Sequence, residues 1–182
     1  MKSVKLRATP LLVIAVYATL YAASIPEYVF PKNVSVKNVK TDFGAKGDGK
    51  ADDTKALQEA VYDNCQYHGI IYLPNGTYRI TAPIVFAMRD GKRMGIGPWM
   101  YEQSRDGVVI KIDDNAPGFL DTTNAQPLIA ATYHKPGEGI SADQFMRVVH
   151  NMTLNAGKNP GAIGIRYYSN NVGSLRNVKI RG

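Results

Sequence analysis

Two segments near the end of this 182-residue chain share one pattern, and that repeat most narrows the choice of fold. HNMTLN (150–155) and RNVKIR (176–181) each place an asparagine, Asn151 or Asn177, before two apolar residues that flank a polar one. The two asparagines are 26 residues apart, and AIGIRYY (162–168) between them alternates as a further short strand. A period of this length that contains short strands predicts a β-solenoid, in which matching asparagines stack as a hydrogen-bonded ladder. A β-sandwich of similar strand density is the alternative.

The middle of the chain contains one helical pattern followed mainly by strands. Apolar residues recur at helical spacing from about Asp53 to about Tyr67, and Gly69 ends the pattern. GIIYLPNGTYRI predicts two strands separated by a turn at 74–76, and DGVVIKID predicts another strand. The segment 88–106 has no clean period, so we interpret it as a long loop.

The stretch TDFGAKGDGKADDTKALQEAV (41–61) places three glycines and four aspartates before the helical pattern. It matches G-x-x-x-x-G-K, but Ala51 stands where a nucleotide loop needs Ser or Thr to hold magnesium. Lys50 likewise stands where a calcium loop starting at Asp48 needs an oxygen ligand. We therefore interpret the stretch as a ligand-free turn, with aspartates capping a helix that covers the end of the solenoid.

Residues 1–24 are typical of a cleavable secretory signal peptide. Three basic residues open the chain, 8–23 carries no charge, and small residues occupy 22–24. A membrane anchor is the alternative, but the apolar run is shorter than the roughly 20 residues that a spanning helix needs. We therefore expect residues 25–182 to be secreted or periplasmic. They hold 19 basic and 15 acidic residues without a dense basic block, which argues against a nucleic acid partner.

NVKTDFGAKGDGKADDTKALQEAV (38–61), followed by GIIYLPNGTYRI (69–80), resembles the N-terminal signature of the pectate-lyase-like superfamily. More narrowly, it resembles the rhamnogalacturonase/epimerase-like group related to glycoside hydrolase family 28. SRDGVVIKIDDNAPGF (104–119) and the final stretch 151–182 resemble the following coils of that group. The resemblance implies an all-β fold, a right-handed parallel β-helix with an N-terminal capping helix. It also implies that residues 25–182 are the N-terminal part of this domain, with the active-site coils beyond Gly182.

The chemistry of polysaccharide cleavage requires facing carboxyl groups or a base near a uronate. Asp113, Asp114 and Asp121 lie in turns and form no evident pair, so we assign no catalytic residue and expect those residues after Gly182. The three histidines lack metal-ligand spacing, and we predict no metal site. No cofactor is evident, and calcium is implied only if the activity is a lyase.

Trp99 and Tyr101 are the candidate substrate-binding residues, because both present a flat apolar face with a polar tip to a sugar ring. The alternative is that they pin a long loop to the core. The resemblance implies a pectin- or rhamnogalacturonan-type glycoside hydrolase or lyase acting on an acidic polysaccharide. Ala51 in the glycine-rich stretch argues against a nucleotide partner. A non-catalytic adhesin or spike-like carbohydrate-binding module is the other reading. The group does not decide between them, since it includes hydrolases, lyases, epimerases and phage tailspikes.

Overall fold

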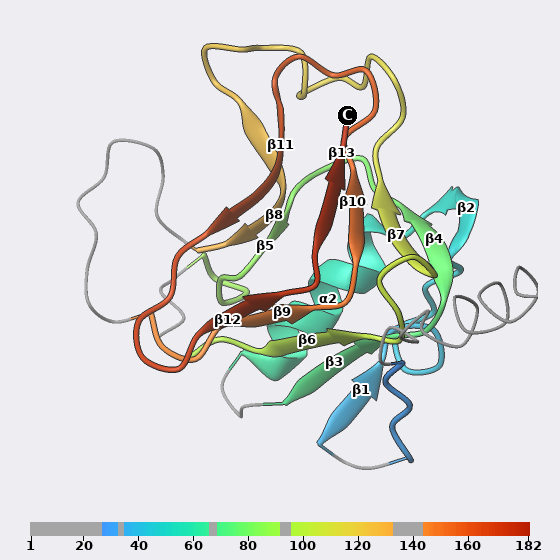
Figure 1. Ribbon diagram of the computed structural model, residues 1–182, viewed down its shortest axis with the longest axis vertical. Coiled ribbons are helices and arrows are strands. Elements are labelled where there is room, and N and C mark those ends of the chain that lie inside the picture. Colours follow the sequence, from blue (N-terminus) through green and yellow to red (C-terminus); the bar gives the residue numbers. More distant parts are fainter. Residues whose placement is uncertain (1–26, 33–34, 66–68, 92–95, 133–143) are drawn as a thin grey trace, which may run out of the picture.

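The computed structural model describes residues 27–32, 35–65, 69–91, 96–132 and 144–182. The predicted signal peptide lies outside these residues. Figure 1 shows three parallel sheets arranged as three faces around one core. Sheet A consists, in spatial order, of β1 (Val36–Asn38), β3 (Ile70–Leu73), β6 (Trp99–Glu102), β9 (Val148–His150) and β12 (Ser174–Arg176).

The other two sheets follow the same coil order. Sheet B runs from β2 (Asp48–Asp52) through β4 (Gly76–Arg79), β7 (Val108–Lys111) and β10 (Thr153–Asn155) to β13 (Lys179–Arg181). Sheet C holds β5 (Ile84–Val85), β8 (Gln126–Ala131) and β11 (Ala162–Tyr167). Each full coil therefore contributes one strand to each sheet, and all neighbouring strands pair in parallel. This is the expected right-handed parallel β-helix.

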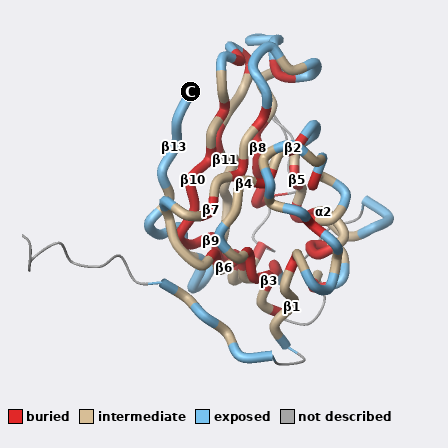
Figure 2. Tube along the Cα trace, turned by 90° about the vertical axis from the view of Figure 1, so that its right-hand side faces the viewer, coloured by how far each residue is buried: buried red, intermediate tan, exposed pale blue. Residues whose placement is uncertain are grey.

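Residues of one register row stack along the interior of the solenoid. Ile71, Met100 and Val149 form such a row in sheet A, and all three are buried. In sheet B, Tyr78, Ile110 and Leu154 form another, and Figure 2 shows the buried residues following β3, β8 and β10. A fully buried large apolar side chain contributes about 1.5–3 kcal/mol, so each row adds several kcal/mol to the stabilising burial.

The asparagine ladder lies at the corner between sheets A and B. Asn151 and Asn177 both have positive φ, 61° and 52°, and the Asn177 side-chain amide donates to the Asn151 side-chain oxygen at 2.7 Å. Thr153 pairs in register with Lys179, so the last two coils repeat at the 26-residue spacing. The ladder prediction is therefore confirmed. The coil before them is longer, since β6 begins at Trp99 and the next strand of sheet A, β9, begins at Val148.

Helix α2 (Thr54–Asn64) covers the N-terminal end of the solenoid, against β3 and β5. Leu57, Ala60 and Val61 lie on its buried face and join the core. The predicted start and covering role are confirmed. The described helix ends at Asn64, and 66–68 lie outside the described residues.

The glycine-rich loop before α2 is held by a carboxylate of the chain itself. The two Asp53 carboxylate oxygens accept the backbone amides of Lys46 and Gly47 at 2.6 and 2.9 Å. Asp53 is the N-cap residue by position, but its side chain makes no cap bond, so the expected capping by an aspartate does not come from Asp53. Asp52 instead accepts the Thr54 amide at 3.0 Å. A phosphate at the loop amides would have to displace Asp53.

The segment 88–106 also departs from the expected long loop, because it contains β6. Trp99, Met100, Tyr101 and Glu102 pair in register with the four residues of β3. Met100 points into the core and Tyr101 points outward, as alternation requires. The pattern was obscured because Trp99 and Tyr101 are large apolar residues on the outer face and Glu102 is an acidic residue on the inner face.

The acidic residue on the inner face of β6, Glu102, should make the stability of the protein depend on pH. Its side chain is fully buried in register with Leu73, and neither carboxylate oxygen has a hydrogen-bond partner. Burial raises the pKa of the Glu102 carboxyl well above its ordinary value near 4.5. The folded state therefore keeps a proton that the unfolded chain releases, and the free energy of unfolding should fall as pH rises above about 4.5.

We predict that Glu102→Leu is more stable than the wild type by a margin that grows as pH rises above about 4.5, by up to about 1.4 kcal/mol per pH unit. The measurement is urea unfolding at several pH values. Glu59→Gln, which changes an ion-paired glutamate on α2, should leave the wild-type pH slope in place. A difference between wild type and Glu102→Leu that stays constant over this range would contradict a neutral buried carboxyl.

Candidate functional site

The outer face of sheet A carries a row of aromatic side chains. Tyr72 on β3, Tyr101 on β6 and His150 on β9 occupy one register row, and Arg176 on β12 continues it. The Tyr101 ring meets the His150 ring edge-on, with centroids 4.9 Å apart. We call Tyr72, Trp99, Tyr101 and His150 the aromatic face.

A segment before β1, residues 27–32, packs on this face. The Tyr28 amide donates to the Gln103 carbonyl at 2.8 Å, and the Tyr72 hydroxyl donates to the Tyr28 carbonyl at 3.0 Å. The Tyr28 ring lies edge-on to Tyr101 at 5.2 Å, and the Phe30 ring contacts Tyr72 at 5.4 Å. The aromatic face therefore holds the N-terminal segment in place. Burial raises the pKa of both Tyr72 and Tyr101.

The two residues expected to bind substrate lie together on the aromatic face. Trp99 and Tyr101 are both half-buried on β6, with ring centroids 6.4 Å apart. The Trp99 indole donates to the Met146 carbonyl at 3.0 Å, which fixes its ring. Tyr101 additionally contacts Phe30 at 5.9 Å. Sugar stacking on these rings stays a prediction, and their observed contacts are with the protein itself.

His150 is the buried histidine of the aromatic face. Its Nε2 lies 2.8 Å from the Ser174 hydroxyl, while Nδ1 is buried without a partner. Burial, together with the positive charge of Arg176, lowers the pKa of His150 below 6.5, so the ring is neutral at pH 7. A neutral ring suits its packing against Tyr101.

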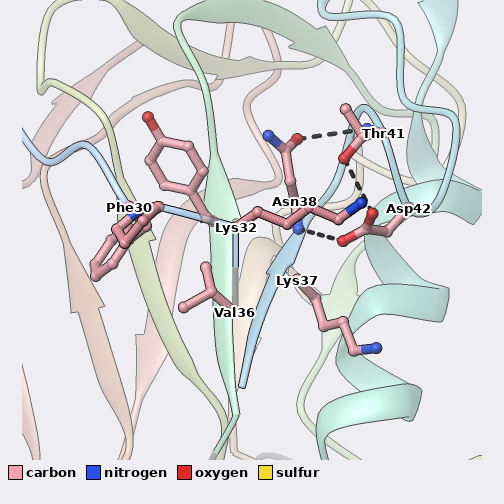
Figure 3. Close-up of a pocket in the computed structure, with 9 residues that line it drawn as sticks. Phe30, Lys32, Val36, Lys37, Asn38, Thr41 and Asp42 are labelled. Carbon is pink, nitrogen blue, oxygen red and sulfur yellow. Dashed lines mark hydrogen bonds between the residues drawn. The ribbon is translucent and has the colours of Figure 1, made fainter. Parts of the chain in front are cut away.

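A pocket of about 670 Å³ lies beside the aromatic face, at the end of sheet A where β1 forms the edge. The N-terminal segment forms one wall, and β1 with the turn after it forms the other (Figure 3). The pocket is lined by Phe30, Pro31, Lys32, Val36, Lys37, Asn38, Thr41, Asp42 and Tyr72. This volume falls within the roughly 300–1,000 Å³ typical of small-molecule sites.

The turn on the β1 side of the pocket is closed by its own hydrogen bonds. The Asp42 carboxylate accepts the Asn38 amide at 2.8 Å and the Thr41 hydroxyl at 3.0 Å. The Asn38 side-chain oxygen accepts the Lys40 amide at 2.9 Å. The first of these bonds also satisfies the Asn38 amide at the end of β1, which is an edge strand of sheet A.

The turn aspartates considered from the sequence are occupied elsewhere. Asp113 pairs with Arg79 at 2.6 Å, and this contact lowers its pKa. Asp114 accepts the Lys158 amide at 2.9 Å, and Asp121 accepts the Thr123 hydroxyl at 2.6 Å. Asp113 and Asp114 therefore have different partners. Within the described ranges, no group of three His, Cys, Asp or Glu side chains converges as a metal site would require.

The model of the family described as rhamnogalacturonase A/epimerase, pectate lyase-like, matches residues 36–182. The chain belongs to this family. The match begins at β1 and includes the capping helix and every strand described above.

Two relatives show how much of a longer protein this chain covers. A glucan 1,3-beta-glucosidase of Cochliobolus carbonum is 30% identical over 150 residues, which are 82% of this chain and 17% of the relative. Alginate lyase 7 of Azotobacter vinelandii is 56% identical over 45 residues, which are 24% of this chain and 5% of that protein. The chain thus spans less than a fifth of the length of either relative.

One solved structure, ORF18 of Geobacillus virus E2, superposes with a TM-score of 0.50 at 21% identity. The superposition covers 88% of this chain and 27% of that one. At this identity the likeness supports the fold and nothing about activity. Separately, no helix in the described part of this family member is long and apolar enough to cross a membrane.

The pocket was not predicted from the sequence, because one wall, residues 27–32, carries no recognisable motif and the other was interpreted as a ligand-free turn. One signal was present in the segment 27–32. Tyr28 and Phe30 alternate with exposed residues, as in a strand laid on an apolar surface. That alternation predicts contact with a sheet face, but it does not indicate which sheet.

We predict that Tyr101→Ala loosens the N-terminal segment, because the Tyr101 ring contacts both Tyr28 and Phe30. The free energy of unfolding should fall by roughly 2–4 kcal/mol. Trypsin should cut after Lys32 faster than in the wild type. Tyr101→Phe keeps the ring and is the matched control, so it should behave like the wild type. Equal cleavage rates in Tyr101→Ala and Tyr101→Phe would contradict the role of the Tyr101 ring in holding the N-terminal segment.

Proposed function

We propose that this chain is the N-terminal part of an exported protein that binds and degrades an acidic polysaccharide. The observation that carries the proposal is the family match over 36–182 on a parallel β-helix whose outer face presents Trp99 and Tyr101. Half-buried rings that are fixed by neighbours lose little entropy on binding, which suits them to stacking on sugar rings.

The named activities of the relatives support action on a polysaccharide and leave the reaction open. One relative is named a glucosidase, one an alginate lyase, and one the mannuronan C5-epimerase AlgE3 of Azotobacter vinelandii. We propose a glycoside hydrolase or a lyase, with a pectin- or rhamnogalacturonan-type polymer as substrate. We assign no catalytic residue to this chain and expect those residues after Gly182.

A continuation of the solenoid is supported by the last described coil. Leu175 and Ile180 lie in register with the buried residues Val149 and Leu154, yet they are 42% and 56% exposed. Figure 2 shows β13 exposed along its length. We propose that further coils cover these side chains in the whole protein.

Export and cofactor use belong to the same proposal. Export with cleavage rests on the charge and apolar pattern of residues 1–24. Recovery of the protein from the cell interior only, or of an exported protein that still begins at Met1, would contradict this part of the proposal. A lyase would call for calcium beside the uronate carboxylate. The described pocket does not fit calcium, because two lysines line it and the turn already binds its one carboxylate, Asp42.

A binding-only role is the second candidate. The observation that favours it is the engagement of Asp113, Asp114 and Asp121 in their own turns and ion pairs. No carboxylate pair faces across a groove among the residues the structure describes. The chain by itself would then hold a polysaccharide without cleaving it.

We predict that residues 25–182 bind polygalacturonate or rhamnogalacturonan weakly and release neither reducing ends nor unsaturated uronate. A longer form that includes the residues after Gly182 should release one of these products.

Affinity electrophoresis on a panel that includes alginate and β-1,3-glucan measures binding. Trp99→Ala should weaken binding about threefold to tenfold, while Trp99→Phe should retain most of it. The absence of binding to every polymer by both forms would contradict the proposal, and turnover by residues 25–182 would contradict the placement of catalysis.

A further inference from the structure

The pocket beside the aromatic face combines positive charge with an aromatic wall. We propose that it binds a carboxylated sugar unit, with the carboxylate on Lys32 and the sugar ring against Phe30. The proposal rests on the proposed function and deepens it, because it names the part of this chain that would bind the carboxylate groups of an acidic polysaccharide.

The net charge of the pocket lining favours binding of a ligand with a single negative charge. Lys32 has no ion-pair partner among the described residues, and Lys37 lies 3.9 Å from Asp63, with both side chains substantially exposed. Such an exposed pair contributes little, so Lys37 stays accessible to a ligand. Asp42 is the one acidic residue in the lining, and its oxygens are already bound by Asn38 and Thr41. The lining therefore carries a net charge of +1, which matches a monoanion such as a uronate better than a phosphate dianion.

The positions of the two lysines place this charge on both walls. Figure 3 shows the Lys32 side chain running from the N-terminal segment toward the turn at Thr41 and Asp42. The Lys37 side chain extends from β1 toward α2. A carboxylate in the pocket would therefore pair with the Lys32 ammonium, and Lys37 would add a weaker attraction from farther away.

The neutral groups of the pocket match a sugar better than a simple ion. Phe30 and Tyr72 supply an apolar wall against which the C–H face of a sugar ring can pack. The Asn38 side-chain oxygen accepts the amides of Lys40 and Thr41, so the side-chain nitrogen is the group left to donate to a hydroxyl. Figure 3 shows that nitrogen on the side away from the bond to Thr41.

Both walls are formed before any ligand binds. Phe30 is held between Tyr72 and Tyr101, and the opposite wall is fixed by the bonds between Asn38 and Asp42. A preformed site avoids the entropy cost of ordering its side chains on binding. The proposed site therefore requires no rearrangement of the described segments.

The test compares the chain's binding of trigalacturonate with its binding of the neutral methyl ester of the same trisaccharide, by calorimetry at low salt. The wild type should bind the acid about tenfold more tightly than the ester. Lys32→Gln should remove that difference while leaving ester binding unchanged. Phe30→Ala should weaken both ligands, and Lys158→Gln, an exposed lysine outside the lining, should change neither. The unfolding midpoint of each variant would show that it is folded.

Equal affinity of the wild type for acid and ester would overturn the proposal, as would an unchanged preference for the acid in Lys32→Gln. Stronger binding of inorganic phosphate than of trigalacturonate would also overturn it, because it would indicate a general anion site. These failures are distinct from failure of the proposed function. Polysaccharide binding that persists unchanged in Lys32→Gln would retain the function and reject this pocket.

Discussion

Parallel register between neighbouring coils determines where each side chain of this protein can point. Because the side chains of a strand alternate, one register row lies inside the solenoid and the next lies outside. Ile71, Met100 and Val149 fill the inner row of sheet A, while Tyr72 and Tyr101 fill an outer one. The same backbone hydrogen bonds therefore build the core and line up the aromatic face.

The N-terminal end of the solenoid shows how a stacked fold can end without exposing its core. Helix α2 covers the interior, and the Asp53 carboxylate fixes the loop that leads into the helix. The Asp42 turn covers the edge of β1, and this same turn forms a wall of the pocket. Closure of this end of the solenoid and formation of the pocket thus share the Asp42 turn.

The sequence predicted the fold well, because its strongest signals were local. The spacing of Asn151 and Asn177, and the apolar face of the helix, report contacts that repeat or lie close in sequence. The site was predicted less completely. Trp99 and Tyr101 were singled out by type, but their strand was missed because Glu102 reverses the usual pattern. The pocket depends on the docking of 27–32 onto strands distant in sequence, which no local pattern specifies.

Hydrogen exchange of backbone amides tests the register of the coils most directly. In a parallel solenoid, β6 and β7 are paired on both sides, whereas β12 and β13 each pair on one side among the described strands. Amides of β6 and β7 should therefore exchange at least about tenfold more slowly than those of β12 and β13. Exchange of β6 or β7 as fast as that of β13 would contradict the stacked architecture on which the core, the aromatic face and the pocket all depend.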